Sequence, residues 1–218
     1  AGRSHQATMR PLGRSSVAPE GRVILLHDVT ERRRAEQDLI LARAELQRAH
    51  AERQQLANTD ALTGLGTRRY FMERLAEEVA RGRRHRQPLS LLMIDLDHFK
   101  QVNERWGHLS GDQVLATAAA LVRAVKRETD LAARMGGEEL AMLLPATDPE
   151  GARRVAERLM ARLRAEPYEA ADGTRFTVTA SIGLALLGDG AASADALVAG
   201  ATRALERAKQ AGRDRLAE

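Results

Sequence analysis

The chain has 218 residues, of which 44% are hydrophobic, 29% are charged and none is cysteine, so the composition suits a globular protein and excludes disulfides and thiolate metal sites. No apolar run is long enough for a transmembrane helix and no secretory signal pattern opens the sequence, so a cytoplasmic chain without a membrane segment is expected. The net charge is +4, but residues 1–57 hold 10 of the 34 Lys and Arg and only 7 of the 30 Asp and Glu, so residues 58–218 are nearly neutral. Because this part is neutral and only 3% of the residues are aromatic, no nucleic-acid partner is predicted.

The first predicted segment, residues 1–30, has little regular pattern. Residues 1–20 are rich in Gly, Ser, Arg and Pro, and we interpret them as disordered, as the cut-off end of a domain, or as vector-derived sequence. The apolar run Val23–Leu26 predicts a strand that leads through Asp28-Val29-Thr30 into a charged stretch. This junction resembles the last strand of a PAS sensor domain and its exit into a signalling helix, which implies an upstream sensor domain in the full-length protein.

Residues 31–57 are predicted to form a linker helix. No Gly or Pro occurs between Arg33 and Leu56. Seven residues in this stretch follow one another at alternating spacings of four and three, which is the spacing of a heptad seam on one face of a helix. Its members are Ala35, Leu39, Ala42, Leu46, Ala49, Arg53 and Leu56. Three alanines and an arginine make a weak seam, so a single solvated helix is the alternative to the dimerising coiled coil that we favour.

Residues 58–218 alternate predicted helices and strands. We expect helices at residues 68–84, 99–106, 113–126, 149–163 and 194–211, strands at 89–94 and 176–187, a hairpin formed by 131–135 and 140–144, and a loop at 107–112. Asp95 and Asp97 follow a strand that is apolar on both faces, where sheet proteins often place ligand or metal groups. The order predicts an α+β fold with a mixed central sheet of the βαββαβ kind.

The predicted hairpin turns at Gly136-Gly137-Glu138-Glu139. Glycines supply the positive φ values that tight turns need, and two adjacent carboxylates favour a divalent cation or a basic ligand nearby. Taken by itself, this turn is better explained as a solvated acidic hairpin.

Six motifs in one order resolve that ambiguity. They are Asp60-x-Leu62-Thr63-Gly64-Leu65, Asp95-Leu96-Asp97-His98-Phe99-Lys100-x-x-Asn103, Gly107-His108-x-x-Gly111-Asp112, the Gly-Gly-Glu-Glu turn, Ser181-Ile182-Gly183 and Ala208-Lys209-x-x-Gly212-Arg213. Together they resemble the GGDEF domain of diguanylate cyclases over about residues 58–216. The resemblance implies a palm-like core related to nucleotidyl cyclases, and a bacterial cytoplasmic enzyme that condenses two GTP into cyclic di-GMP and two pyrophosphates.

The resemblance also implies roles for individual residues. The metal site, for two Mg²⁺ or Mn²⁺ ions, would use Asp95, the Leu96 carbonyl and Glu138, with Glu139 as a further ligand or as the base for the 3′-hydroxyl. Gly136 and Gly137 would let the backbone approach the phosphates. The remaining GTP-binding residues implied are Asn103 and Asp112 for guanine, Lys209 and Arg213 for the phosphates, and His108, Phe99 and Lys100.

Two further features follow from the resemblance. Each domain of this family binds one GTP, so catalysis implies a homodimer, which the helix at 31–57 would provide. Arg127 and Asp130 resemble the family's RxxD inhibitory site for the product, with Arg158 as a supporting contact. An Arg and an Asp three residues apart are otherwise usually a capping or surface pair.

The sequence departs from the family pattern at a few positions. These are Leu140 for Phe, Glu104 for Asp, Thr67 for Asn, Thr202 for Asp and Glu206 for Tyr. None is an implied metal, guanine or phosphate residue. The alternative to an active cyclase is a module that binds GTP or cyclic di-GMP without turnover and signals to a partner.

Overall fold

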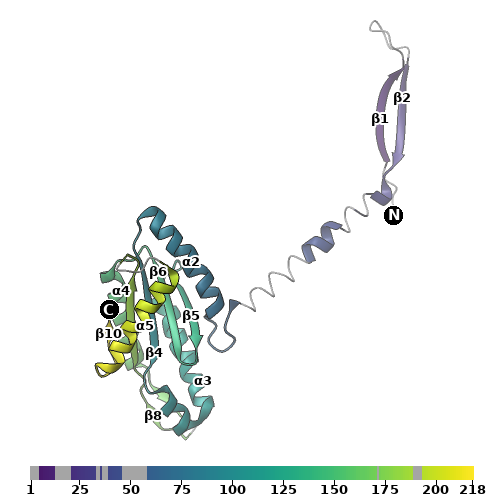
Figure 1. The fold of residues 1–218 in the computed structure, drawn as a ribbon. Helices are drawn as coiled ribbons and strands as arrows, with labels where there is room; N and C mark the ends of the chain where they lie inside the picture. Colours follow the sequence, from purple (N-terminus) through teal and green to yellow (C-terminus); the bar gives the residue numbers. More distant parts are fainter. Residues whose placement is uncertain are drawn as a thin grey trace. The chain divides into compact units, whose positions relative to one another are not determined.

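The computed structural model describes residues 5–12, 21–32, 35, 39–45, 58–170, 172–188 and 193–218. The chain divides into two compact units, Ala1–Gln54 and Gln55–Glu218, which we describe separately (Figure 1). Within the described residues, no helix is both long enough and apolar enough to cross a membrane.

The first unit contains an antiparallel pair of strands, β1 (His5–Leu12) and β2 (Gly21–Asp28). β2 includes the strand predicted at Val23–Leu26. β1 lies within residues 1–20, where the sequence predicted no strand because its Gly, Ser, Arg and Pro residues show no periodicity. Asp28 accepts a hydrogen bond from the backbone N–H of Thr30 at 3.0 Å, and the helical residues 30–32 begin there. Residues 35 and 39–45 are also helical. The predicted seam beyond residue 45 lies outside the described residues, so the coiled coil stays a prediction.

The second unit is built on a six-stranded mixed sheet. Its strands follow the order β10 (Leu216–Ala217), β9 (Ala180–Leu186), β4 (Leu89–Leu96), β6 (Glu139–Pro145), β5 (Leu131–Gly136) and β3 (Gly66–Thr67). β4 is antiparallel to both β6 and β9, β5 and β6 form the predicted hairpin, and the short edge strands β3 and β10 are parallel to their neighbours. The α+β fold with a mixed sheet is thus confirmed.

Four helices cover the two faces of this sheet (Figure 1). They are α2 (Arg68–His85), α3 (Phe99–Val125), α4 (Pro149–Ala165) and α5 (Ala194–Gln210). Leu92, Ile94 and Leu96 of β4 pack in the cluster that contains α3 and α4, while Leu91 and Met93 pack in the cluster with α2 and α5. Alternation along β4 therefore decides which helix each of its side chains meets.

Two predictions within this unit were wrong. The loop expected at 107–112 is a kink, since only Gly107 leaves helical geometry (φ 80°, ψ 163°) and α3 continues beyond it. The strand expected at 176–187 is split into β8 (Arg175–Phe176), which pairs with β7 (Tyr168–Glu169), and β9. At the break, the N–H of Asp97 donates to the carbonyl of Thr179 at 2.8 Å. The backbone at residue 179 is therefore hydrogen-bonded to the residue that follows β4.

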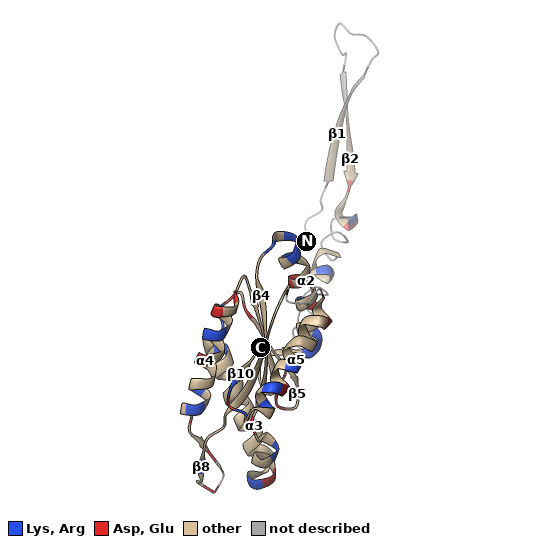
Figure 2. Cartoon of the chain, turned by 60° about the vertical axis from the view of Figure 1, so that its left-hand side comes forward, with Lys and Arg blue, Asp and Glu red and all other residues tan. Residues whose placement is uncertain are grey.

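Both signs of charge occur along the helices of this unit, as α4 illustrates (Figure 2). Arg153 on α4 pairs with Glu150 at 2.8 Å, and Arg69 on α2 pairs with Glu73 at 2.8 Å. Such exposed pairs contribute little stability and leave the surface close to neutral.

Candidate active site

Asp95 is the carboxylate that the central strand presents toward α5. It lies on the β4 face that packs against α2 and α5, is 8% exposed, and accepts a hydrogen bond from the Lys209 ammonium at 2.9 Å. The antiparallel register places its Cα opposite that of Glu139 on β6. One strand end thus brings together three charged residues that are far apart in the sequence.

The position of Lys209 depends on Gly183 of β9. A Cβ at residue 183 would lie 2.1 Å from the carbonyl oxygen of Ala201 and 2.3 Å from the backbone nitrogen of Leu205. Only glycine therefore lets α5 lie directly on β9. The close packing fixes the helix that carries Lys209, which gives a physical reason for the glycine in the Ser-Ile-Gly motif.

The pKa values of this ion pair reflect its crowded surroundings. Burial raises the pKa of Asp95, and although Lys209 lowers it, the negative charges of Glu138 and Glu139 raise it again, so the net shift is upward. Burial alone would lower the pKa of Lys209, but the hydrogen bond and charge of Asp95, together with the charges of Glu206 and Glu139, raise it above its usual value. Asp95 thus sits where one more positive charge would be favourable.

Arg134 supports the acidic hairpin tip through a hydrogen bond to its backbone. Gly136 and Gly137 have φ values of 147° and 52°, which favour glycine, and the predicted turn is confirmed. The Arg134 Nε donates to the carbonyl of Gly137 at 2.9 Å, and its guanidinium lies 3.5 Å from the carboxylate of Asp60. Glu138 and Glu139 remain partly exposed beside this support.

Asp60 in turn organises the first family motif. Its carboxylate accepts hydrogen bonds from the N–H and hydroxyl of Thr63, at 2.8 and 2.6 Å. Burial opposes ionisation, but these bonds and Arg134 together lower the pKa of Asp60. No role was predicted for Asp60 or Arg134 from the sequence. For Asp60 the signal was its motif, which has a structural explanation, whereas Arg134 belongs to none of the six motifs.

A cavity of about 360 Å³ lies beside Asp95 and the tip. Its lining contains Asp95, Leu96, His98, Phe99, Lys100, Gln101, Glu104, Glu138, Lys209 and Arg213. Seven of these are residues that the resemblance implicated in binding metal or nucleotide. Three cationic side chains and three carboxylates on one cavity suit a polyanionic ligand that binds together with a cation.

The implied guanine residues lie on α3, outside that lining. Asn103 precedes the kink at Gly107, and His108 and Asp112 follow it as exposed residues. The Oδ1 of Asn103 lies only 2.0 Å from the position that a Cβ at Gly111 would take. Glycine at 111 therefore allows Asn103 to approach the second part of the helix.

The second carboxylate after β4, Asp97, has neutral partners. It is 4% exposed and accepts hydrogen bonds from the hydroxyls of Thr179 and Ser181, both at 2.7 Å, and from the N–H of Asp214 at 3.0 Å. From the sequence, both carboxylates after this strand were candidates for ligand groups, and the family resemblance implied a metal role for Asp95 alone. The oxygens of Asp97 are instead occupied by groups of the chain.

The two RxxD residues form a compact turn before β5. The carboxylate of Asp130 accepts a hydrogen bond from the backbone N–H of Arg127 at 2.7 Å, while the Arg127 side chain is exposed. The other oxygen of Asp130 is buried without a hydrogen-bond partner. Arg158 on α4 donates to the carbonyl of Val125, at the end of α3, at 2.6 Å. The turn thus contains the cap expected of such a pair, together with an unused carboxylate oxygen.

The donor chemistry fits a divalent cation. Carboxylates of Asp95 and Glu138 and the carbonyl of Leu96 are oxygen ligands of the kind that Mg²⁺ and Mn²⁺ prefer. Across the described ranges, no group of three His, Cys, Asp or Glu side chains is arranged to hold a metal ion. The fit therefore rests on the type and charge of the donors.

Comparison with known proteins gives consistent matches. Residues 57–215 match the family described as diguanylate cyclase, GGDEF domain. The chain is 45% identical over 169 residues to the diguanylate cyclase DgcP of Pseudomonas aeruginosa, covering 77% of this chain and 25% of that protein. It is 39% identical over 178 residues to the diguanylate cyclase TpbB of the same species, covering 80% and 41%. The chain thus spans less than half of the length of these relatives.

A solved structure extends the match to three dimensions. The coiled coil and GGDEF domain of DgcB from Caulobacter crescentus, in complex with c-di-GMP, superposes with a TM-score of 0.77 at 29% sequence identity. The match covers 87% of this chain and 99% of that chain.

Proposed function

Because the chain belongs to the GGDEF family of diguanylate cyclases, we propose that it condenses two GTP molecules into cyclic di-GMP with release of two pyrophosphates. The observation that carries the proposal is the cavity on which Asp95, Glu138, Lys209 and Arg213 meet, next to an intact Gly-Gly-Glu-Glu tip. We further propose that residues 58–218 form the catalytic domain. Residues 31–57 would be its linker, and residues 1–30 the end of an upstream sensor domain in a bacterial cytoplasmic protein.

In this proposal, charge and hydrogen bonding select the substrate. Lys209 and Arg213 bind the triphosphate, and the cavity residues Phe99 and Lys100 border it. Guanine presents ring N–H and amino donors, for which the amide of Asn103 and the carboxylate of Asp112 are suitable partners. His108, just after the kink, would complete this part of the site.

Asp95, Glu138 and the Leu96 carbonyl would hold Mg²⁺ or Mn²⁺, two per site, with Glu139 as a further ligand or as the base. Such ions neutralise phosphate charge and stabilise the attacking and leaving oxygens. In each half-reaction the 3′-oxygen of one GTP bonds to the α-phosphorus of the other. Its proton passes to the base, for which Glu139 is the candidate, and pyrophosphate leaves. Gly136 and Gly137 keep the tip free of a Cβ at the approaching phosphates.

One GTP per chain makes the reaction depend on a homodimer. We therefore expect cyclic di-GMP production from GTP and Mg²⁺ or Mn²⁺, with a rate per chain that rises with protein concentration until the dimer is saturated. Glu139→Ala should lower the rate at least about 100-fold while the thermal unfolding curve stays unchanged. Absence of product at high protein concentration, with GTP still bound, would instead favour the non-catalytic signalling module.

Product inhibition forms the finer part of the proposal. Arg127, Asp130 and Arg158 would bind cyclic di-GMP, and the exposed Arg127 guanidinium and the unpaired oxygen of Asp130 support this. Arg127→Ala is expected to raise the product concentration needed for half inhibition about tenfold or more. Arg162→Ala, which removes an exposed arginine from α4, is the matched control. An unchanged inhibition curve in Arg127→Ala would contradict the assignment.

A further inference from the structure

The turn between α5 and β10 has an unusual backbone. Gly212, Arg213 and Asp214 follow one another with φ values of 111°, 61° and 47°. The left-handed region is unfavourable for residues with a Cβ, so two such residues in succession require support from their surroundings. Asp214 receives that support from two directions.

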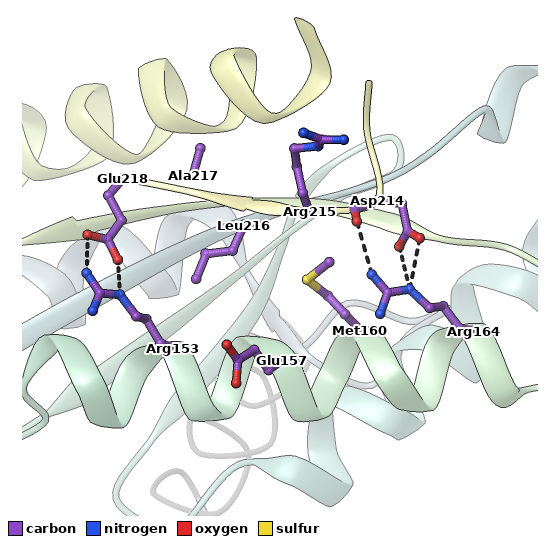
Figure 3. Close-up of a pocket in the computed structure, with 9 residues that line it drawn as sticks. All are labelled: Arg153, Glu157, Met160, Arg164, Asp214, Arg215, Leu216, Ala217 and Glu218. Carbon is purple, nitrogen blue, oxygen red and sulfur yellow. Dashed lines mark hydrogen bonds and ion pairs between the residues drawn. The ribbon is translucent and has the colours of Figure 1, made fainter. Parts of the chain in front are cut away.

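One support comes from the end of β4 and the other from α4. The Asp97 carboxylate accepts a hydrogen bond from the N–H of Asp214 at 3.0 Å. The Arg164 Nε donates to both carboxylate oxygens of Asp214 at 2.8 Å, and its Nη2 donates to the Asp214 carbonyl at 3.0 Å, as Figure 3 shows. The N–H, the carbonyl and the side chain of this residue are thus all held.

The neighbour of Asp214 in the sequence is Arg213, whose side chain lines the cavity with Asp95, Glu138 and Lys209. Its carbonyl accepts from the Arg215 Nε at 3.0 Å, and its N–H donates to the carbonyl of Ala208 at 3.1 Å. These two hydrogen bonds fix the backbone of Arg213. In the part of the chain that the structure describes, its guanidinium forms no ion pair, so the side-chain charge remains available to a ligand.

We propose that Arg164 and Asp97 are positioning residues for the nucleotide, because they hold the left-handed turn that points Arg213 into the cavity. The inference rests on the proposed function, in which Arg213 binds the triphosphate. Arg164 stays outside the cavity lining and acts only through Asp214.

A second arginine on α4 provides a matched control. Arg153 pairs with Glu218, with its Nη2 2.7 Å from the Glu218 carboxylate, and so ties the far end of the same C-terminal segment to the same helix (Figure 3). A merely structural role would make Arg153 and Arg164 equivalent. The positioning role makes only Arg164 matter for GTP.

Steady-state kinetics on the full 218-residue chain separate these roles. Arg164→Ala is expected to raise KM for GTP about 5- to 10-fold with kcat within about twofold, whereas Arg153→Ala leaves KM unchanged. In an Arg213→Ala background, Arg164→Ala should add no further increase, since residues that act through one another are not additive. Equal effects of the two alanine variants, or an undiminished effect of Arg164→Ala without Arg213, would overturn the proposal.

Calorimetric binding of a GTP analogue with a methylene group between the α- and β-phosphorus gives a test without turnover. Arg164→Ala should weaken the binding of this analogue by a similar factor and leave GMP, which lacks the outer phosphates, unaffected. Equal affinity of wild type and Arg164→Ala for the analogue would reject the positioning role. Failure of the wild type to bind it would reject the proposed function itself.

Discussion

Asp95 and Asp97 stand two residues apart at the end of one strand, and their surroundings differ in kind. Asp95 is buried beside a single ammonium and two further carboxylates, and its pKa is raised. Asp97 is buried among two hydroxyls and a backbone N–H, all at 2.7 to 3.0 Å. A further positive charge would stabilise the Asp95 carboxylate, whereas the oxygens of Asp97 already accept three hydrogen bonds. In the proposed function, two buried carboxylates two residues apart thus differ in role, since Asp95 binds metal and Asp97 holds the neighbouring chain in place.

The largest effect should come from the member of the pair that faces the cavity. Asp95→Asn is expected to lower cyclic di-GMP synthesis at least about 100-fold, since the neutral amide neither holds a metal as a carboxylate does nor balances Lys209. The raised pKa shows that folding disfavours the ionised form, so the same change should leave stability at pH 7 unchanged or increased. Activity assays with urea unfolding test both parts. A large loss of stability would contradict this difference.

Asp97→Ala should show the opposite balance. It leaves the hydroxyls of Thr179 and Ser181 and the N–H of Asp214 without their acceptor, which should reduce the free energy of unfolding by about 2–4 kcal/mol. The urea midpoint should fall with an unchanged m-value. Asp97→Asn keeps one acceptor oxygen and serves as the milder control. Stability equal to wild type in Asp97→Ala would contradict the stabilising role that distinguishes Asp97 from Asp95.

The smallest expected effect isolates one bond of the Asp97 group. Ser181→Ala removes one donor from a fully buried position and should cost about 1–2 kcal/mol in unfolding free energy. Combined with Asp97→Ala, it should cost less than the sum of the single changes, because the two groups share one interaction. Thermal or urea unfolding of the double variant measures this, and full additivity would show that the bond contributes little.

Much of the fold was predictable because its signals are local. The apolar run of β4 and the helical periodicity of α2, α4 and α5 gave elements close to those observed, and the two glycines marked the hairpin turn. The error at residues 107–112 arose because Gly, Ser and Asp are typical of loops. Here Ser110 donates to the carbonyl of Trp106 within the helix at 2.9 Å, and Gly111 serves the close approach of Asn103.

The candidate site was predictable only as a set of residues. The difference between the surroundings of Asp95 and Asp97 depends on Lys209, Ser181 and Thr179, which lie more than 80 residues further along the chain. Periodicity carries no information about such partners. The role of Gly183 likewise follows only from the approach of α5 to β9, which sequence spacing cannot express.

The support beneath the hairpin tip matters for protein engineering. Arg134 joins the Gly137 carbonyl to Asp60, and Asp60 is itself held by Thr63 in a separate turn. Grafting the four tip residues onto another β-hairpin would transfer the two carboxylates without the side chain that fixes the loop. A transplantable version would have to carry Arg134 and the 60–65 turn as well, so the smallest portable unit is discontinuous in sequence.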